Sequence, residues 1–324
     1  MPVETPNHSP TRILPLLVAL PLALATAASH LGTWWWGLAL IAHFRPHLAA
    51  LSLVSVGLGL LWRARLGAAL SLALLAVNTA PLLPYLGLAT RSSAAPPANL
   101  RVLAYNMHRE DTDRPAFREL IEREQPDLVV LSEISGDVTA LAEETALPAY
   151  RAGEPSAGLL YGIVLFSRWP VQDWHVERSA DGVGSALSAE LCASERWQGC
   201  LRVIALHAAP PFWDGADTQA QQLEIAARLA AEAHEHRAVL AGDLDLTPWS
   251  PAFAELLARG GLVDTGLSRG LTATWLSRLP FLGLMIDHVL VSPDITVIDN
   301  RLGAQIGSEH FPVTVDLAIP SASP

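Results

Sequence analysis

The stretch LAGDLDLTPWSP, Leu240–Pro251, places two aspartates two residues apart, at the end of an apolar run and just before a proline-marked turn. Residues i and i+2 of a β-strand point to the same side. Asp243 and Asp245 should therefore project together from the end of a strand over 237–245. Two carboxylates in such a place are costly unless they meet a metal ion, a proton or a hydrogen-bond donor. An Asp before Thr-Pro is also a common turn former, so other positions must decide between a site and a turn.

The same placement recurs along residues 100–320. Several apolar runs in this part of the chain are expected to form buried strands. Each of them carries polar residues at the end where the strand meets a loop. Taken singly, such a residue is usually a surface group, a helix cap or a hydrogen-bonded structural histidine. Their recurrence at strand ends favours one shared site. The residues are Asn106, Glu133, His207, Asp243, Asp245, Asp287, His288, Ser308, Glu309 and His310.

The pattern of apolar runs predicts an α+β fold. Many strands with few helices between them, some in adjacent hairpins, favour two packed, mostly antiparallel sheets with helices outside. The predicted strands are 100–105, 127–134, 161–167, 171–177, 185–191, 201–207, 237–245, 286–292 and 313–319, and the predicted helices are 114–126, 216–236 and 249–260.

Metal-assisted phosphoryl transfer is the chemistry that needs this set of residues. A hard divalent ion prefers oxygen ligands such as those of Asn and Glu, and it neutralises charge on phosphoryl oxygens. A histidine paired with an aspartate is a general base that can take a proton from water near neutral pH.

The ordered segments YNM, LSEI, ALHAAP, AGDLDLTPWS, IDHVLVS and GSEHFPV resemble the endonuclease/exonuclease/phosphatase superfamily, which has the DNase I-like fold. The resemblance covers about Leu100 to Ile319. It implies a four-layer α/β sandwich, an Mg²⁺ or Mn²⁺ cofactor and hydrolysis of phosphoester bonds. The apolar N-terminal part together with TPWSP resembles a bacterial membrane-anchored subgroup.

The resemblance also implies roles for single residues. Glu133 would be the principal metal ligand with Asn106 beside it, and Glu309 would stand for a family aspartate that helps to hold metal or phosphate. His310 would be the general base, oriented by Asp287. The remaining catalytic residues would be Asp243, which positions or deprotonates the attacking water, and His207, which contacts the phosphate or assists the leaving group.

Two positions depart from the family pattern. Asp245 stands where the family usually has Asn, and an ionised carboxylate repels a phosphoryl oxygen to which an amide can donate. Asp245 would then hold a second metal ion, be protonated, or mark lowered activity. Glu309 in place of Asp adds one methylene to the side chain. Both changes keep oxygen ligands, so an active enzyme is the favoured reading.

The sequence predicts a membrane anchor over residues 1–89, a linker over residues 90–99 and a catalytic domain over residues 100–320. Three apolar runs, at 13–28, 48–62 and 66–88, predict about three transmembrane helices, with a signal peptide or a buried helical hairpin as the alternatives. Arg12, Arg63 and Arg65 lie on one side of such an arrangement, which should be cytoplasmic, although Arg45 opposes this orientation. The expected location is the bacterial inner membrane with the catalytic domain outside the cytoplasm.

The charge of residues 97–324 bears on the substrate. They carry 31 acidic residues and 16 arginines, a formal charge of −15, and the chain contains no lysine. Nucleic-acid binders usually present a basic excess, so a nuclease is the alternative function and not the first one. A lipid-linked or small-molecule phosphoester remains open, as does an inactive protein that keeps the fold. The apolar loop at 277–285 either faces lipid or packs at a rim, and no obligate protein partner is evident.

Cys192 and Cys200 are the two cysteines of the chain and flank a short segment between two predicted strands. Opposite positions in a hairpin bring Cβ atoms within reach of a disulfide, which would fit an oxidising compartment. Two unrelated buried thiols are the alternative.

Overall fold

The computed structural model describes residues 14–32, 34–87, 96–108, 111–134, 137–154, 162–193, 195–197, 199–212, 215–233 and 237–320. The chain divides into two compact units, one made of Met1–Leu83 with Trp249–Pro251 and the other of Pro84–Pro248 with Ala252–Pro324. Part of the predicted linker lies outside the described residues, so the segment bounds 1–89, 90–99 and 100–320 stay predictions.

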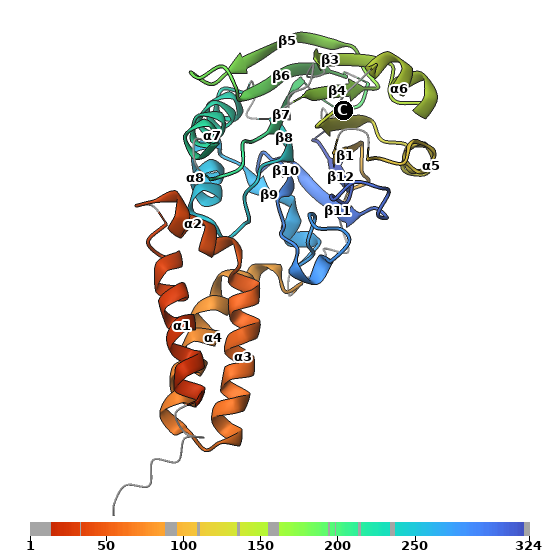
Figure 1. Ribbon diagram of the computed structural model, residues 1–324. Coiled ribbons are helices and arrows are strands. Elements are labelled where there is room, and N and C mark those ends of the chain that lie inside the picture. Colours follow the sequence, from red (N-terminus) through yellow and green to blue (C-terminus); the bar gives the residue numbers. More distant parts are fainter. Residues whose placement is uncertain are drawn as a thin grey trace, which may run out of the picture. The chain divides into compact units, whose positions relative to one another are not determined.

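Two six-stranded sheets form the larger unit (Figure 1). The strands are β1 (Leu100–Asn106), β2 (Leu128–Ser132), β3 (Tyr150–Glu154), β4 (Ile163–Ser167), β5 (Val171–Arg178), β6 (Ser185–Cys192), β7 (Cys200–His207), β8 (Ala238–Asp243), β9 (Val263–Asp264), β10 (Asp287–Val291), β11 (Thr296–Leu302) and β12 (Val313–Ala318). One sheet has the order β11-β12-β1-β2-β4-β3 and the other β5-β6-β7-β8-β10-β9. Each contains one parallel pair, β1 with β2 and β7 with β8, and its other pairs are antiparallel.

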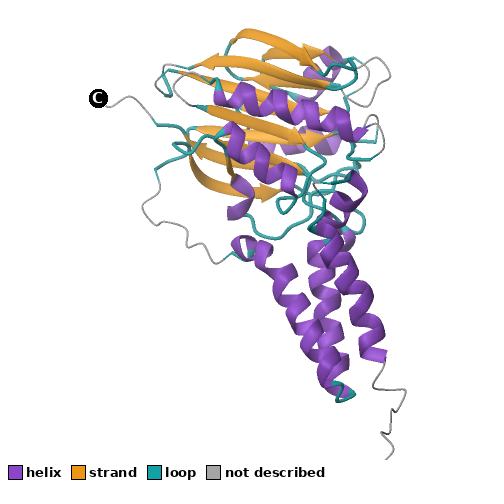
Figure 2. Cartoon of the chain, turned by 90° about the vertical axis from the view of Figure 1, so that its left-hand side faces the viewer, coloured by secondary structure: helices purple, strands orange, loops and turns teal. Residues whose placement is uncertain are grey.

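Alternate residues of the central strands face two different apolar layers. Val102 and Val130 of one sheet meet Val203 and Val239 of the other in a core between the sheets. The outer faces are covered by helices (Figures 1 and 2). These helices are α5 (Arg114–Glu124) and α6 (Val138–Thr145) on one sheet, and α7 (Gly215–Ala231) and α8 (Pro251–Gly260) on the other. The predicted DNase I-like sandwich of two packed sheets between helices is confirmed.

The elements that the sequence pattern did not predict lie mostly at the edges of the sheets. β3, β9 and β11 are outermost or short strands, and β11 is only half-buried along most of its length. An edge strand packs one side less completely and tolerates polar residues, so it lacks the continuous apolar run of a central strand. The short helix α6, which begins at its N-cap Asp137, was also not predicted.

Cys192 and Cys200 form a disulfide, with their Cα atoms 4.3 Å apart. They face each other as the last register pair between β6 and β7. Of the two alternatives left open by the sequence, the hairpin disulfide is therefore the one that the structure contains.

Helices make up the smaller unit. They are α1 (Leu14–Ser29), α2 (Trp36–His43), α3 (Arg45–Leu61) and α4 (Arg65–Thr79), and α4 continues into the 3₁₀ helix η2 (Ala80–Tyr85). In the part of the chain that the structure describes, one helix, Arg65–Tyr85, could cross a membrane by its length and composition. A second crossing is obtained if α2 and α3, bent by 64°, count as one broken span, whereas α1 is apolar but shorter. This is weak evidence for a membrane segment, and the three spans stay a prediction.

Polar groups inside this unit pair across its helices. The hydroxyls of Ser55 and Ser71 are 2.8 Å apart, and the Asn78 amide donates to Thr26 Oγ1 at 2.9 Å. Gly59 lets α3 approach the backbone of Ala68 closely, because a Cβ at Gly59 would lie 2.8 Å from the Ala68 Cα. Small residues and hydroxyl pairs between helices are typical of membrane helix packing.

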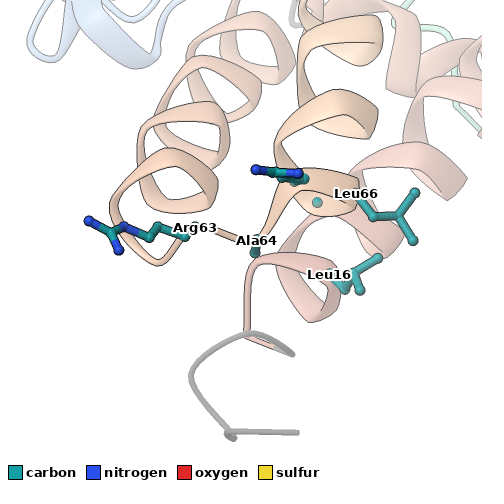
Figure 3. Close-up of a pocket in the computed structure, with 6 residues that line it drawn as sticks. Leu16, Arg63, Ala64 and Leu66 are labelled. Carbon is teal, nitrogen blue, oxygen red and sulfur yellow. The ribbon is translucent and has the colours of Figure 1, made fainter. Parts of the chain in front are cut away.

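The outward faces of these helices carry large apolar side chains. Leu24 is 72% exposed and Leu61 73% exposed. Leu17, Leu20, Leu51, Leu53, Val54, Leu60, Leu66 and Leu72 are exposed as well. At the α3–α4 turn, two exposed arginines, Arg63 and Arg65, line a cavity of about 540 Å³ together with Leu16, Ala64, Leu66 and Gly67 (Figure 3).

Candidate active site

The polar residues predicted at strand ends converge because of the way the sheets are connected. The parallel strands β1 and β2 end together at Asn106 and Ser132, and β7 and β8 end together at His207 and Asp243. The antiparallel neighbour β10 starts at the same edge, where Asp287 pairs with Asp243. The loop before β12 reaches the corresponding edge of the first sheet, because Val313 pairs with Ala104.

Gly242 explains how Asp243 reaches this edge. Its φ is +139°, and a Cβ at this position would lie 1.9 Å from the carbonyl oxygen of Leu206 on the neighbouring strand. Only glycine fits this close approach of two backbones. The glycine of the Gly-Asp pair is therefore a structural requirement of the site.

Asp287 and His310 form the best defined pair. Asp287 Oδ2 lies 2.9 Å from His310 Nδ1, which leaves Nε2 facing Asp243 at 3.7 Å from its Oδ2. The Oγ1 of Thr274 accepts the backbone N–H of Asp287, and the Ser308 hydroxyl accepts the N–H of His310. Both side chains are almost fully buried, so this orientation is held from several directions.

Asn106, Glu133 and His207 meet on the other side of Asp243. The Asn106 amide nitrogen donates to Glu133 Oε1 at 2.9 Å and to Asp243 Oδ2 at 3.0 Å. Its oxygen accepts the backbone N–H of His108. His207 Nε2 lies 3.6 Å from Glu133 Oε1 and 3.9 Å from Asp243 Oδ2. A metal-ligand role for Asn106 would require its oxygen to face Glu133, whereas here the nitrogen does.

Two site residues have a left-handed backbone, with φ of +50° at Glu133 and +48° at Asp245. Asp and Asn adopt this conformation more readily than other residues with a side chain, which accounts for an Asp or Asn at position 245. Glu133 gains no such benefit, and its conformation costs on the order of 1–3 kcal/mol. A strained backbone at a carboxylate is a common feature of functional sites.

The charges of the cluster shift one another's protonation. Burial, and next the nearby Asp287, raise the pKa of Asp243; burial and Asp243 raise the pKa of Asp245 well above its usual range. Burial alone would raise the pKa of Asp287, but His310 lowers it overall. Burial opposes the charging of His310, yet Asp287, Asp243 and Asp245 together raise its pKa to about 10.

The donor set fits a divalent cation. Glu133 Oε2 is buried and has no hydrogen-bond partner among the residues that the structure describes. Two groups could each hold an ion, His207 with Asp243 and Asp245, and Asp243 with Asp287 and His310. Within each group the ligand atoms lie within 4.8 Å of one another. Several carboxylates so close together repel each other, and a hard cation bound by oxygen ligands would relieve that repulsion.

Seven of the eight residues predicted for the site are brought together here, and Glu309 is the exception. Its backbone oxygen accepts the N–H of Ser277, and no described contact joins its side chain to the cluster. Its metal-ligand role stays a prediction, as do the other assigned roles. His288, also at a strand end, points instead to the carbonyl oxygens of Leu246 and Met285. Thr274 was missed because no strand end or motif marks it in the sequence.

Comparisons with known proteins identify the family and the fold of the chain. The model of the Endonuclease/Exonuclease/phosphatase family matches residues 103–310. An endonuclease/exonuclease/phosphatase from Beutenbergia cavernae DSM 12333 is 22% identical, with a TM-score of 0.57, over 69% of this chain and 72% of that one. A search of the curated proteins found no match.

Two further solved structures share the fold. One is a 3′ phosphatase from Neisseria bound to a product DNA hairpin, 21% identical over 67% of this chain and 98% of that one, with a TM-score of 0.53. The other is a mannosyl-6-phosphatase from Bacteroides thetaiotaomicron, 14% identical over 67% and 99%, also with a TM-score of 0.53. At these identities the likeness shows the fold alone.

Proposed function

The chain belongs to the endonuclease/exonuclease/phosphatase family, and from this premise we propose that it is a membrane-anchored, divalent-metal-dependent phosphoesterase. Water would attack the phosphorus of a phosphodiester or phosphomonoester in line with the leaving oxygen. The observation that carries this proposal is the position of Asp243, which is adjacent both to the Asp287–His310 pair and to the group formed by Asn106, Glu133 and His207.

The chain's own residues supply the proton transfers. His310 Nε2 and Asp243 Oδ2 are 3.7 Å apart, so one water molecule can hydrogen-bond to both. His310 in its neutral form would take the proton of that water, and the buried Asp287 would stabilise the imidazolium that forms. The neighbouring carboxylates raise the pKa of His310, so a cation that offsets their charge would also make the neutral ring available. His207, across Asp243, contacts the phosphate or assists the leaving group. A bound divalent cation, Mg²⁺ or Mn²⁺, supplies charge neutralisation at the phosphoryl oxygens.

The proposed anchor is the helical unit. Its exposed leucines would be costly in water over so wide a surface, whereas lipid chains accommodate them. Its buried serines are hydrogen-bonded, and the amide nitrogen of Asn78 donates to Thr26 Oγ1, which is the kind of pairing that polar groups need within a membrane. In a bacterium, an anchor of this kind would lie in the inner membrane. The disulfide between Cys192 and Cys200 supports a catalytic unit outside the cytoplasm.

An apolar loop beside the site supports a lipid-linked phosphoester as the substrate. Phe281 is 74% exposed, and Leu279 and Leu282 are each 46% exposed. The loop is joined to the site through Ser277, whose N–H donates to Glu309 O, and through the bridge between Trp275 and His310. Of the two readings of residues 277–285, we favour contact with lipid. The charge of −15 over residues 97–324 disfavours a nucleic-acid substrate.

The test uses the full-length protein in neutral detergent. Hydrolysis of an aryl phosphodiester, a short-chain phospholipid and single-stranded DNA would be measured with Mg²⁺, with Mn²⁺ and with EDTA. We expect metal-dependent turnover that Asp243→Asn abolishes. The control is Asp294→Asn, which removes an exposed carboxylate paired with Arg237 outside the site. Metal-induced stabilisation without turnover of any substrate would instead identify an inactive protein that keeps the fold.

A further inference from the structure

Arg45, the first residue of α3, is a buried charge with few partners. It is 5% exposed. Its Nη2 lies 3.4 Å from each ring nitrogen of His30. Within the described part of the chain, neither Nε nor Nη1 has a hydrogen-bond partner. A guanidinium stays charged in proteins, and buried charges are costly unless an opposite charge meets them.

Among the residues that the structure describes in the helical unit, no acidic side chain meets this charge. Glu4 is the one acidic residue in residues 1–96, and it lies outside the described residues. The helices α1 to α4 contain no carboxylate at all. A neutralising anion must therefore come from elsewhere.

The start of α3 adds further donors at the same place. The chain bends by 64° between α2 and α3, and α3 begins without a side-chain cap and without an acidic residue in its first turn. A helix N-terminus carries unsatisfied N–H groups and a partial positive charge, which together favour anions, although Pro46 in this first turn has no N–H. His47 lies in this first turn, and its buried Nδ1 also has no partner among the described residues. Arg45 thus presents donors without an acceptor, and the Nδ1 of His47, which donates in one tautomer and in the charged ring, has no partner among the described residues either.

We propose that the N-terminus of α3, with Arg45 and His47, is a binding site for a phosphate group. The planar guanidinium matches phosphate oxygens through two parallel hydrogen bonds, and the helix start offers the complementary backbone donors. In a membrane helix that is broken in this way, the positive end of the second half commonly faces an anionic group. The phosphate is carried either by a lipid headgroup or by a small soluble molecule. This site shares no residue with the carboxylate cluster and does not depend on its activity.

The arginines at the α3–α4 turn provide a matched comparison. Arg63 and Arg65 are also guanidiniums of the helical unit, but both are exposed to solvent. Water screens an exposed charge, so neither of them requires a bound anion. Arg63→Met is therefore the control for Arg45→Met.

The experiment measures melting temperature and affinity of the full-length protein, with EDTA and in an Asp243→Asn background so that all samples share the same catalytic site. One arm titrates inorganic phosphate in neutral maltoside micelles, and the other titrates phosphatidylglycerol into the same micelles. We expect a rise in melting temperature that Arg45→Met abolishes, with at least tenfold weaker binding, while Arg63→Met stays within about twofold of the parent. A response to both probes assigns a free phosphate group, and a response to the lipid alone assigns a headgroup.

Two further variants keep the test decisive if Arg45→Met does not fold. Arg45→Lys keeps the charge but loses the planar fork, and His47→Ala removes the second donor, so each should weaken binding severalfold. Without phosphate or anionic lipid, Arg45→Met should melt higher than the parent, because it removes an uncompensated buried charge. The proposal is overturned if the parent responds to neither probe, or if the Arg45 and Arg63 variants bind equally well.

Discussion

The carboxylate of Asp287 and the imidazole of His310 meet at 2.9 Å although they belong to different sheets. Asp287 opens β10 of one sheet, and His310 lies in the loop that leads into β12 of the other. The pair therefore forms only when the two sheets are packed. The geometry of the candidate site is a consequence of sheet packing as well as of local sequence.

Asp287→Asn should lower turnover about a hundredfold or more, the range typical of losing a well-placed acid–base partner. The amide cannot stabilise the imidazolium as a buried carboxylate does, and it also allows the wrong ring nitrogen to carry the proton. The measurement is kcat for an aryl phosphodiester, together with NMR titration of the His310 ring, whose pKa should fall. Unchanged kcat with a lowered pKa would remove His310 from the proton-transfer step.

Much of this site could be predicted from the sequence, because most of its polar side chains lie where buried strands begin or end. Five site residues lie at or directly beside the end of a central strand whose apolar run is easily recognised. They are Asn106, Glu133, His207, Asp243 and Asp287. Whether such ends share one edge depends on the parallel pairing of β1 with β2 and of β7 with β8. The pattern of apolar runs did not predict that parallel pairing, because it depends on contacts between segments that are distant along the chain.

Other structural features could not be predicted from the sequence, because they depend on contacts with residues that are distant along the chain. β11 pairs with β12 as an edge strand whose polar residues resemble a loop. The amide of Asn106 is turned by the His108 N–H and by two carboxylates that arrive from other strands. The buried state of Arg45 was equally invisible, since a lone arginine between apolar runs is typical of a membrane-flanking loop.

The stability of the metal-free protein should depend on the charge of His310. Its pKa is raised from an ordinary value near 6.5 to about 10 in the folded state, so protonation favours folding. The stabilisation is complete below about pH 6.5 and is lost as the pH rises towards 10. In EDTA, the difference in free energy of unfolding between the parent and His310→Gln should therefore shrink over that window. A difference that stays constant from pH 6 to pH 10 would contradict the raised pKa.

Mg²⁺ should also change the pKa at which the ring of His310 titrates. A divalent cation among the carboxylates removes part of the negative charge that raises the pKa of His310, so saturating Mg²⁺ should lower it. NMR titration of the ring with and without Mg²⁺ measures this shift directly, and Ca²⁺ serves as a control for a cation of equal charge. Identical titration curves with and without the ion would mean that no cation binds beside His310.

Asp245→Asn should raise kcat/KM, by about tenfold if the amide gains one hydrogen bond to a charged phosphoryl oxygen. Asn tolerates the φ of +48°, so the backbone can stay as it is. Removal of the carboxylate also relieves its repulsion of Asp243, whose pKa should fall. Asp245→Ala is the matched control, because it removes the charge without supplying a donor. If both variants lose activity in parallel, Asp245 is itself needed as a ligand or proton carrier.

Gly242→Ala should destabilise the protein by at least about 3 kcal/mol, because the strained φ and the steric overlap act together. The added Cβ would lie 1.9 Å from the Leu206 carbonyl oxygen, so β7 and β8 must separate where His207 and Asp243 end. Urea unfolding measures the loss of stability, and residual turnover measures the displacement of His207 and Asp243 from each other. Gly57→Ala is the control, since a Cβ at Gly57 meets nothing within 4 Å.

Phe281→Ser should separate lipid substrates from soluble ones. Phe281 is exposed in a loop that is joined to the site only through neighbouring residues, so its removal leaves the carboxylates and histidines in place. Turnover of a soluble aryl phosphodiester should stay within about twofold, whereas turnover of phospholipid in vesicles should fall about tenfold, because a buried aromatic contact contributes roughly 1.5–3 kcal/mol. Val263→Ser, a change at another exposed apolar residue outside the loop, should affect neither substrate. Equal losses on both substrates would show that the loop supports the site itself, and no loss on vesicles would leave Phe281 without a role in lipid contact.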